Sequence, residues 1–193
     1  MLCFHPVKLY AVYHPRRCLD SGFFDFINQI INHKKITMSK VHDLFSEYAQ
    51  SHQNKTNIII HWFCVPIIFY CTAGILWCIP MPESFKAIGF PINLGTIGLT
   101  LAFIYYSFLS RILSYGMILV ISGIISLQYS IINSYGTKIW IPYLIIFWVA
   151  WILQFIGHDK EGKKPAFMKD FQFLLIGPFY LLGKIYKKLG IAY

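Results

Sequence analysis

Long apolar runs that lack Asp, Glu, Lys and Arg constrain this 193-residue chain more than any other feature. Such runs cover residues 58–80, 87–110, 112–132 and 139–157. A helix needs about 20 apolar residues to cross the hydrocarbon core of a bilayer, and each run is close to that length. Only 13% of the residues are charged, whereas soluble domains carry about 25%. The sequence therefore predicts an all-α membrane protein with a bundle of four transmembrane helices.

Two segments that flank these runs differ from them. In residues 40–50 the apolar side chains recur at spacings of three and four, which predicts an amphipathic helix lying at the membrane interface. Residues 171–186 are shorter and are interrupted by Gly177 and Pro178. We expect this last segment to be re-entrant or interfacial, and a fifth transmembrane helix is the alternative.

The first 37 residues are unlike the rest of the chain. They mix proline and basic residues with a short apolar stretch that is too polar for a transmembrane helix. We expect residues 1–37 to be a non-native or disordered leader and Met38 to be the natural start. Residues 38–193 then form a single multi-pass membrane domain.

The charge balance is strongly basic, with 17 Lys and Arg, 8 Asp and Glu, and a net charge of +9. In a soluble protein this balance would suggest a nucleic-acid partner. Here the basic residues lie between and after the apolar runs, so we expect contact with the lipid bilayer and no nucleic acid. Seven of the 14 lysines follow the fourth run, and the segments after the first and third runs carry one each, which predicts that both termini are cytoplasmic. The membrane would be the inner membrane in a bacterium and the endoplasmic reticulum in a eukaryote.

Polar side chains gather where the first apolar run begins and where the fourth ends. His52 and His61 lie at the first place, and His158 and Glu161 lie at the second. In an up-down bundle these two places share one membrane face, so we expect the four side chains to converge there. Imidazole and carboxylate ligands with open coordination positions are typical of non-haem Fe(II) oxygenases. A hydrogen-bonding role for the histidines and a solvated Glu161 remain alternatives at this point.

The two polar segments together resemble the 2-hydroxy-fatty-acid dioxygenase family. The resemblance extends over residues 38–189, and it rests on His52 and His61 with the asparagines between them and on residues 151–166 around His158. It implies an Fe2+-dependent enzyme of fatty-acid α-oxidation. Such an enzyme takes a long-chain 2-hydroxy fatty acid and O2, and it releases CO2 and a fatty acid one carbon shorter.

The resemblance also implies roles for individual residues. The expected metal ligands and catalytic residues are His52, His61, His158 and Glu161, and the expected substrate contacts are Asn54, Asn57, Lys163 and Lys164. This chain departs from the fungal members at two points. Gln53 stands where they have a histidine, and Glu161 lies one residue nearer to the last histidine than their carboxylate does.

Three alternative functions come from other classes. The first is a non-catalytic small membrane protein, such as a lipid-binding or scaffold subunit, which would bind no metal. The second is a transporter, although the apolar runs contain almost no ionisable residues near their centres. The third is a hydrolase or desaturase-like lipid enzyme that uses the same histidines with another metal. The sequence leaves the acyl-chain length, the metal and the oligomeric state open.

Overall fold

A computed structural model describes residues 40–50, 52–82, 92–161 and 167–193. In the last of these ranges, side chains are described only from residue 173 onward. All of these residues belong to one compact unit, Thr37–Tyr193. The predictions for residues 1–37, Lys163 and Lys164 lie outside the described residues. Within the described ranges the regular structure is helical, with no strand, so the predicted all-α class is confirmed.

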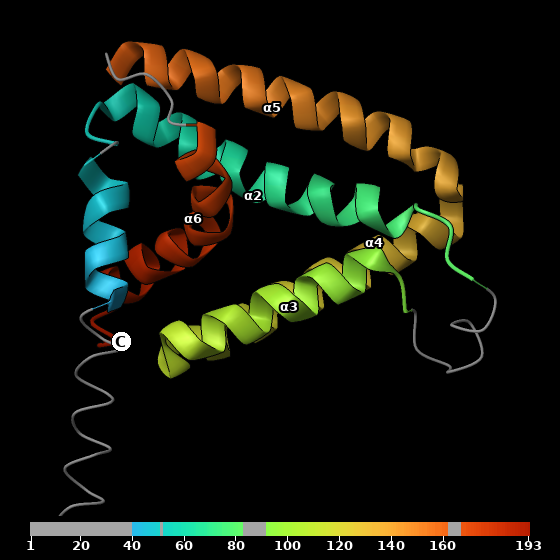
Figure 1. Cartoon of the computed structure of the whole chain (residues 1–193), viewed down its shortest axis with the longest axis horizontal. Coiled ribbons are helices and arrows are strands. Elements are labelled where there is room, and N and C mark those ends of the chain that lie inside the picture. Colours follow the sequence, from blue (N-terminus) through green and yellow to red (C-terminus); the bar gives the residue numbers. More distant parts are fainter. Residues whose placement is uncertain (1–39, 51, 83–91, 162–166) are drawn as a thin grey trace, which may run out of the picture. The chain divides into compact units, whose positions relative to one another are not determined.

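Figure 1 shows the helices in their order along the chain. After the helix over residues 40–50, the described elements are α2 (Lys55–Trp77), α3 (Leu94–Leu109), α4 (Arg111–Tyr135), the short 3-10 helix η2 (Thr137–Ile139), α5 (Trp140–Glu161) and α6 (Phe167–Lys188). The four helices from α2 to α5 run alternately in opposite directions (Figure 1). The end of α5 therefore returns to the side on which α2 begins.

Two residues turn the chain between neighbouring helices. Ser110 has an extended backbone, donates its N–H to the Tyr106 carbonyl at the end of α3, and accepts from the Leu113 N–H in the first turn of α4. Gly136 ends α4 with a φ of 69°, a left-handed conformation that glycine adopts without steric cost. These two turns make α3, α4 and α5 successive antiparallel helices.

Three of the described helices, α2, α4 and α5, are long and apolar enough to cross a membrane. The apolar helix α3 has 16 residues, a length of about 24 Å against a hydrocarbon core of about 30 Å. The predicted second run began at residue 87, and its first residues lie outside the described ranges. Many large apolar side chains are exposed, including Phe63, Phe108 and Leu119. A soluble monomer does not expose apolar surface on this scale, so the bundle is that of a membrane protein.

The predicted amphipathic helix over residues 40–50 is present. Its apolar face, formed by Val41, Phe45 and Tyr48, is buried. Phe45 packs edge-to-face on Phe179 of α6, with ring centroids 5.9 Å apart. The apolar face is therefore covered by α6.

Helix α6 contains Pro178 and bends along its length (Figure 1). Proline lacks the N–H that continues a helical ladder, so a bend is expected there. The Tyr106 hydroxyl of α3 donates to the Leu175 carbonyl near the bend at 2.6 Å. Among the described residues, α6 does not have the length and composition of a membrane-spanning helix, and its re-entrant or interfacial position stays a prediction.

Candidate metal centre

The first turn of α2 is joined to the last turn of α5 by hydrogen bonds. Asn54 caps α2, because its side-chain oxygen accepts the Thr56 N–H at 2.9 Å. The Glu161 carboxylate accepts the backbone N–H of Gln53 at 2.9 Å and that of Asn54 at 2.8 Å. It also accepts the side-chain N–H of Asn57 at 3.1 Å. Three donors from one segment of the chain thus hold the end of α5 in place.

A glycine allows the two helices to approach closely at this point. Gly157 of α5 is buried against Asn57 of α2, and a Cβ atom at residue 157 would collide with the Asn57 side-chain oxygen. Asn57 is itself completely buried. Any larger residue at 157 would push α5 away from α2 and would shift His158, its neighbour in sequence.

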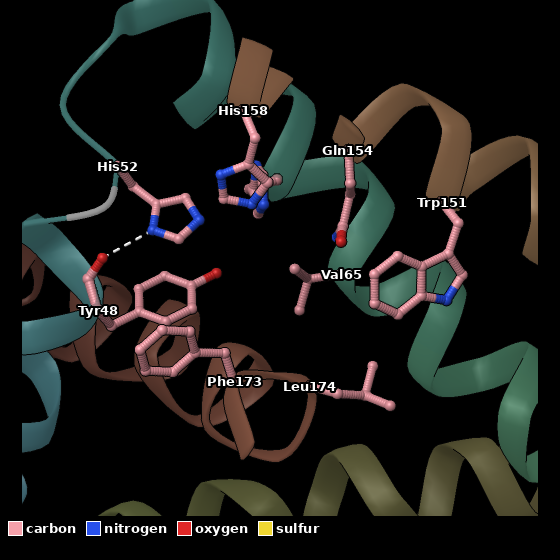
Figure 2. A pocket seen from close by; sticks show the side chains of 9 residues that line it. Tyr48, His52, Val65, Trp151, Gln154, His158, Phe173 and Leu174 are labelled. Carbon is pink, nitrogen blue, oxygen red and sulfur yellow. Dashed lines mark hydrogen bonds between the residues drawn. The ribbon is translucent and has the colours of Figure 1, made fainter. Parts of the chain in front are cut away.

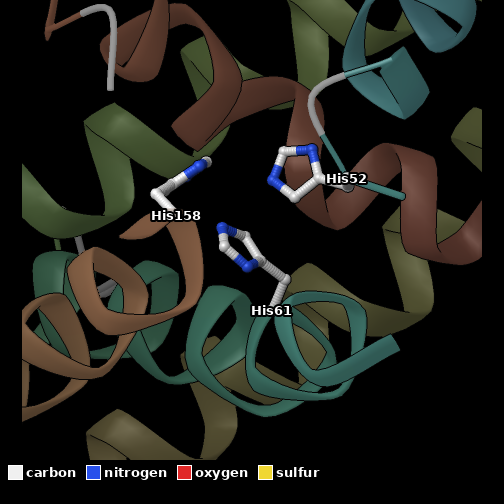
Figure 3. A group of neighbouring side chains, drawn as sticks. All are labelled: His52, His61 and His158. Carbon is white, nitrogen blue, oxygen red and sulfur yellow. The ribbon is translucent and has the colours of Figure 1, made fainter. Parts of the chain in front are cut away.

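Three histidines meet beside this contact (Figure 3). His52 precedes α2, His61 lies two turns into α2, and His158 lies in the last turn of α5. All three are buried, and one nitrogen from each lies within 4.8 Å of the others. The ring centroids are 4.2 Å apart for His52 and His61, 5.2 Å for His52 and His158, and 4.9 Å for His61 and His158. The expected convergence of the three imidazoles is thus present in the fold.

Backbone carbonyls fix the tautomer of two of these rings. The Nδ1 atom of His52 lies 2.7 Å from the Tyr48 carbonyl, and that of His61 lies 2.9 Å from the Asn57 carbonyl. A carbonyl oxygen can only accept, so each Nδ1 must carry the proton, and each Nε2 keeps its lone pair. The same second hydrogen bond orients most metal-binding histidines. Both rings are therefore prepared to offer Nε2 as a ligand.

The donor set fits a metal ion. The Nε2 atom of His52 is buried and has no hydrogen-bond partner among the described residues, a costly arrangement that a cation would relieve. Burial lowers the pKa of His52, which favours the neutral form that binds metal. Nitrogens bound at about 2.1 Å to one ion lie at most about 4.2 Å apart. The imidazoles need to draw together only slightly from their present separation.

A small cavity of about 20 Å³ opens beside the three imidazoles (Figure 2). It is lined by His52, His61 and His158, and by Tyr48, Val65, Trp151, Gln154, Phe173 and Leu174. A cavity of this size holds about one water-sized group. Its walls come from α2, α5, α6 and the helix over residues 40–50.

The other predicted site residues lie around this cavity or outside the described ranges. Glu161, Asn54 and Asn57 do not line the cavity. The cluster of possible metal-binding atoms within 4.8 Å of one another consists of nitrogens of the three histidines and includes no Glu161 oxygen. The polar atoms of Glu161 and the two asparagines instead make the contacts that join α2 to α5. Metal ligation by Glu161 and substrate contact by the two asparagines stay predictions, as do the roles of Lys163 and Lys164.

Sequence reasoning overlooked two residues of the cavity wall. Tyr48 lies four residues before His52, and its ring stacks on that imidazole with centroids 4.2 Å apart. Gln154 lies four residues before His158, and its amide points into the cavity (Figure 2). In both cases the signal was a spacing of four from a candidate ligand, which places two side chains on one helix face.

Comparison with known proteins identifies the family. The family model described as "2-hydroxy-palmitic acid dioxygenase Mpo1-like" matches residues 38–189. The chain is 25% identical over 147 residues to the 2-hydroxy-palmitic acid dioxygenase MPO1 of Saccharomyces cerevisiae, an alignment that covers 74% of this chain and 78% of the yeast protein. No solved structure matches the chain. Because the family model covers most of its length, including all three histidines, the chain belongs to the Mpo1-like family.

Proposed function

We propose that this protein is an Fe2+-dependent dioxygenase that converts a long-chain 2-hydroxy fatty acid and O2 to CO2 and a fatty acid one carbon shorter. The observation that carries the proposal is the meeting of three buried imidazoles beside a water-sized cavity. Family membership supports the same chemistry. The reaction also releases one water, and O2 takes up the four electrons that the hydroxy acid loses. No further reductant is needed.

Fe2+ held by His52, His61 and His158 would supply open coordination positions at which an oxygen-bearing substrate and O2 can meet. The protein's own groups prepare the site for it. The carbonyls of Tyr48 and Asn57 hold two imidazoles in the tautomer that binds metal. Apolar side chains such as Trp151 and Leu174 line the cavity and limit the entry of water.

The acyl tail has an apolar pocket available within the bundle. A pocket of about 540 Å³ lies among α2, α4, α5 and α6, and its walls include Pro66, Ile124 and Leu181. Pockets that hold small ligands measure about 300–1,000 Å³. Trp62, the residue after His61, also lines this pocket, which supports binding of the tail on the side of α2 next to the imidazoles.

The proposal includes a cytoplasmic position for the centre and for both termini. It is supported by the lysines that follow α5, since cytoplasmic segments carry an excess of basic residues. The membrane would be the endoplasmic reticulum in a eukaryote or the inner membrane in a bacterium.

A product assay tests this function. Detergent-purified protein, reconstituted with Fe2+ without oxygen, should convert 2-hydroxypalmitate to pentadecanoate and CO2 when O2 is admitted. His61→Ala should abolish conversion, whereas His42→Ala, which changes an exposed histidine outside the centre, should not. Unchanged 2-hydroxypalmitate after incubation with metal-loaded wild-type protein would contradict the proposal. It would favour the non-catalytic alternative.

A further inference from the structure

The bundle contains two buried glutamines whose surroundings differ. Gln128 of α4 is completely buried, and both ends of its amide are paired. It donates to the Tyr70 carbonyl at 3.0 Å and accepts from the Tyr143 hydroxyl at 2.7 Å. These bonds connect α4 to α2 and α5, so Gln128 has a structural role.

Gln154 has no comparable partners. Its side chain is 7% exposed and lines the cavity beside the three histidines. Within the described part of the chain, its amide makes no hydrogen bond. The amide is not sealed in the interior but is open to the cavity, where a bound group can pair with it. The arrangement indicates that the Gln154 amide is reserved for a ligand.

The size of the cavity limits what that ligand can place there. About 20 Å³ admits one oxygen-sized group, and a planar carboxylate needs more room. In the metal-loaded protein the Nε2 lone pairs of His52 and His61 would be taken up by the ion and their Nδ1 protons by backbone carbonyls, so these rings offer the substrate no hydrogen bond. The Gln154 amide adds both a donor and an acceptor to this wall. A hydroxyl group, which also donates and accepts, matches the cavity in size and in hydrogen bonding.

We propose that Gln154 binds the 2-hydroxyl group of the substrate and thereby sets the preference for 2-hydroxy acids over ordinary fatty acids. The inference rests on the proposed function, because it assumes a 2-hydroxy acid as the substrate. A site built to pair with a hydroxyl discriminates strongly against an analogue that lacks it, because the polar group of the site is then left unpaired. An ordinary fatty acid has no 2-hydroxyl group and would leave the Gln154 amide without a hydrogen-bond partner.

Ligand binding to the Co2+-reconstituted full-length protein tests the inference without turnover. The visible Co2+ spectrum reports metal occupancy, and its change on titration gives the affinity for 2-hydroxypalmitate and for palmitate. Wild-type protein should bind 2-hydroxypalmitate at least about tenfold more tightly than palmitate. In Gln154→Leu this preference should disappear, with metal content and palmitate affinity unchanged.

The matched control is Gln128→Leu, which should keep the preference and lose thermal stability, because the Tyr70 carbonyl and the Tyr143 hydroxyl lose a partner. Gln154→Leu should melt no lower than wild type, since it removes an amide that has no protein partner. A wild-type preference retained in Gln154→Leu would overturn the inference, and so would loss of its metal or its stability. If wild-type protein binds neither Co2+ nor 2-hydroxypalmitate, the proposed function fails, and the inference fails with it.

Discussion

The Glu161 carboxylate, in the last turn of α5, lies 2.8 Å from the backbone nitrogen of Asn54, the residue that caps α2. The same carboxylate accepts from Gln53 and from the Asn57 side chain. The Asn57 carbonyl in turn orients His61. Glu161 therefore connects the helix that carries His158 to the segment that carries the other two histidines.

We predict that Glu161→Gln weakens metal binding by about 10- to 100-fold, the usual effect of losing a group that supports metal ligands. The neutral amide has only one acceptor oxygen for the three donors. Titration of the Co2+ protein measures both the affinity and the spectrum of the metal. The spectrum should keep its shape if the Glu161 carboxylate only positions the helices through its three hydrogen bonds. A changed spectrum would show that Glu161 is itself a ligand, and the exposed Asp159→Asn serves as the control.

Gly157→Ala should destabilise the protein by about 1–3 kcal/mol, the cost of forcing extra volume into a packed contact. The added Cβ atom would collide with the Asn57 side-chain oxygen. Thermal unfolding in detergent measures the effect, and metal affinity should fall with it because His158 shifts. Gly123→Ala is the matched control, since a Cβ there meets nothing within 4 Å. Equal unfolding temperatures for the two variants would argue against close contact between α2 and α5.

The sequence was sufficient to predict the helical class, the antiparallel arrangement and the approach of His52, His61 and His158. Long apolar runs indicate helices that cross the membrane. Because successive helices run in opposite directions, their order then determines which helix ends lie on the same side of the membrane. The partners of Glu161 were not predictable, because its spacing from His158 is equally consistent with a metal ligand and with a hydrogen-bond acceptor. The role of Gln128 depends on tertiary contacts with Tyr70 and Tyr143 that leave no local pattern in the sequence.

Tyr143→Phe should lower stability by about 1 kcal/mol, the range measured for hydrogen bonds between membrane helices. The substitution removes the donor to the Gln128 side-chain oxygen. Metal content should be unchanged, because neither residue lines the cavity beside the histidines. Chemical or thermal unfolding of the metal-free protein measures the loss, and the exposed Tyr135→Phe is the control. Loss of metal in Tyr143→Phe would contradict this separation of structural and binding roles.

Metal binding should stay constant through about pH 6.5, the pKa of an unperturbed histidine, and should weaken only as the pH approaches the lowered pKa of His52. Burial lowers the pKa of His52, so the folded chain takes up fewer protons there than the unfolded chain does. The contribution of His52 to stability is therefore complete above about pH 6.5 and declines as the pH falls toward the lowered pKa. Protons also compete with the metal for the imidazoles. Equilibrium dialysis over a series of pH values below about 7 measures the change, and a decline in Fe2+ affinity centred at about pH 6.5, the unperturbed histidine pKa, would contradict ligation by a buried His52.

Elemental analysis of the purified protein tests the central claim most directly. Wild-type protein reconstituted with Fe2+ without oxygen should hold near-stoichiometric iron, and His158→Ala should lose it because one of the three imidazoles is absent. The exposed His42→Ala should retain iron at the wild-type level. Iron that is equally abundant in wild-type and His158→Ala protein, or absent from both, would contradict a metal centre built from these histidines.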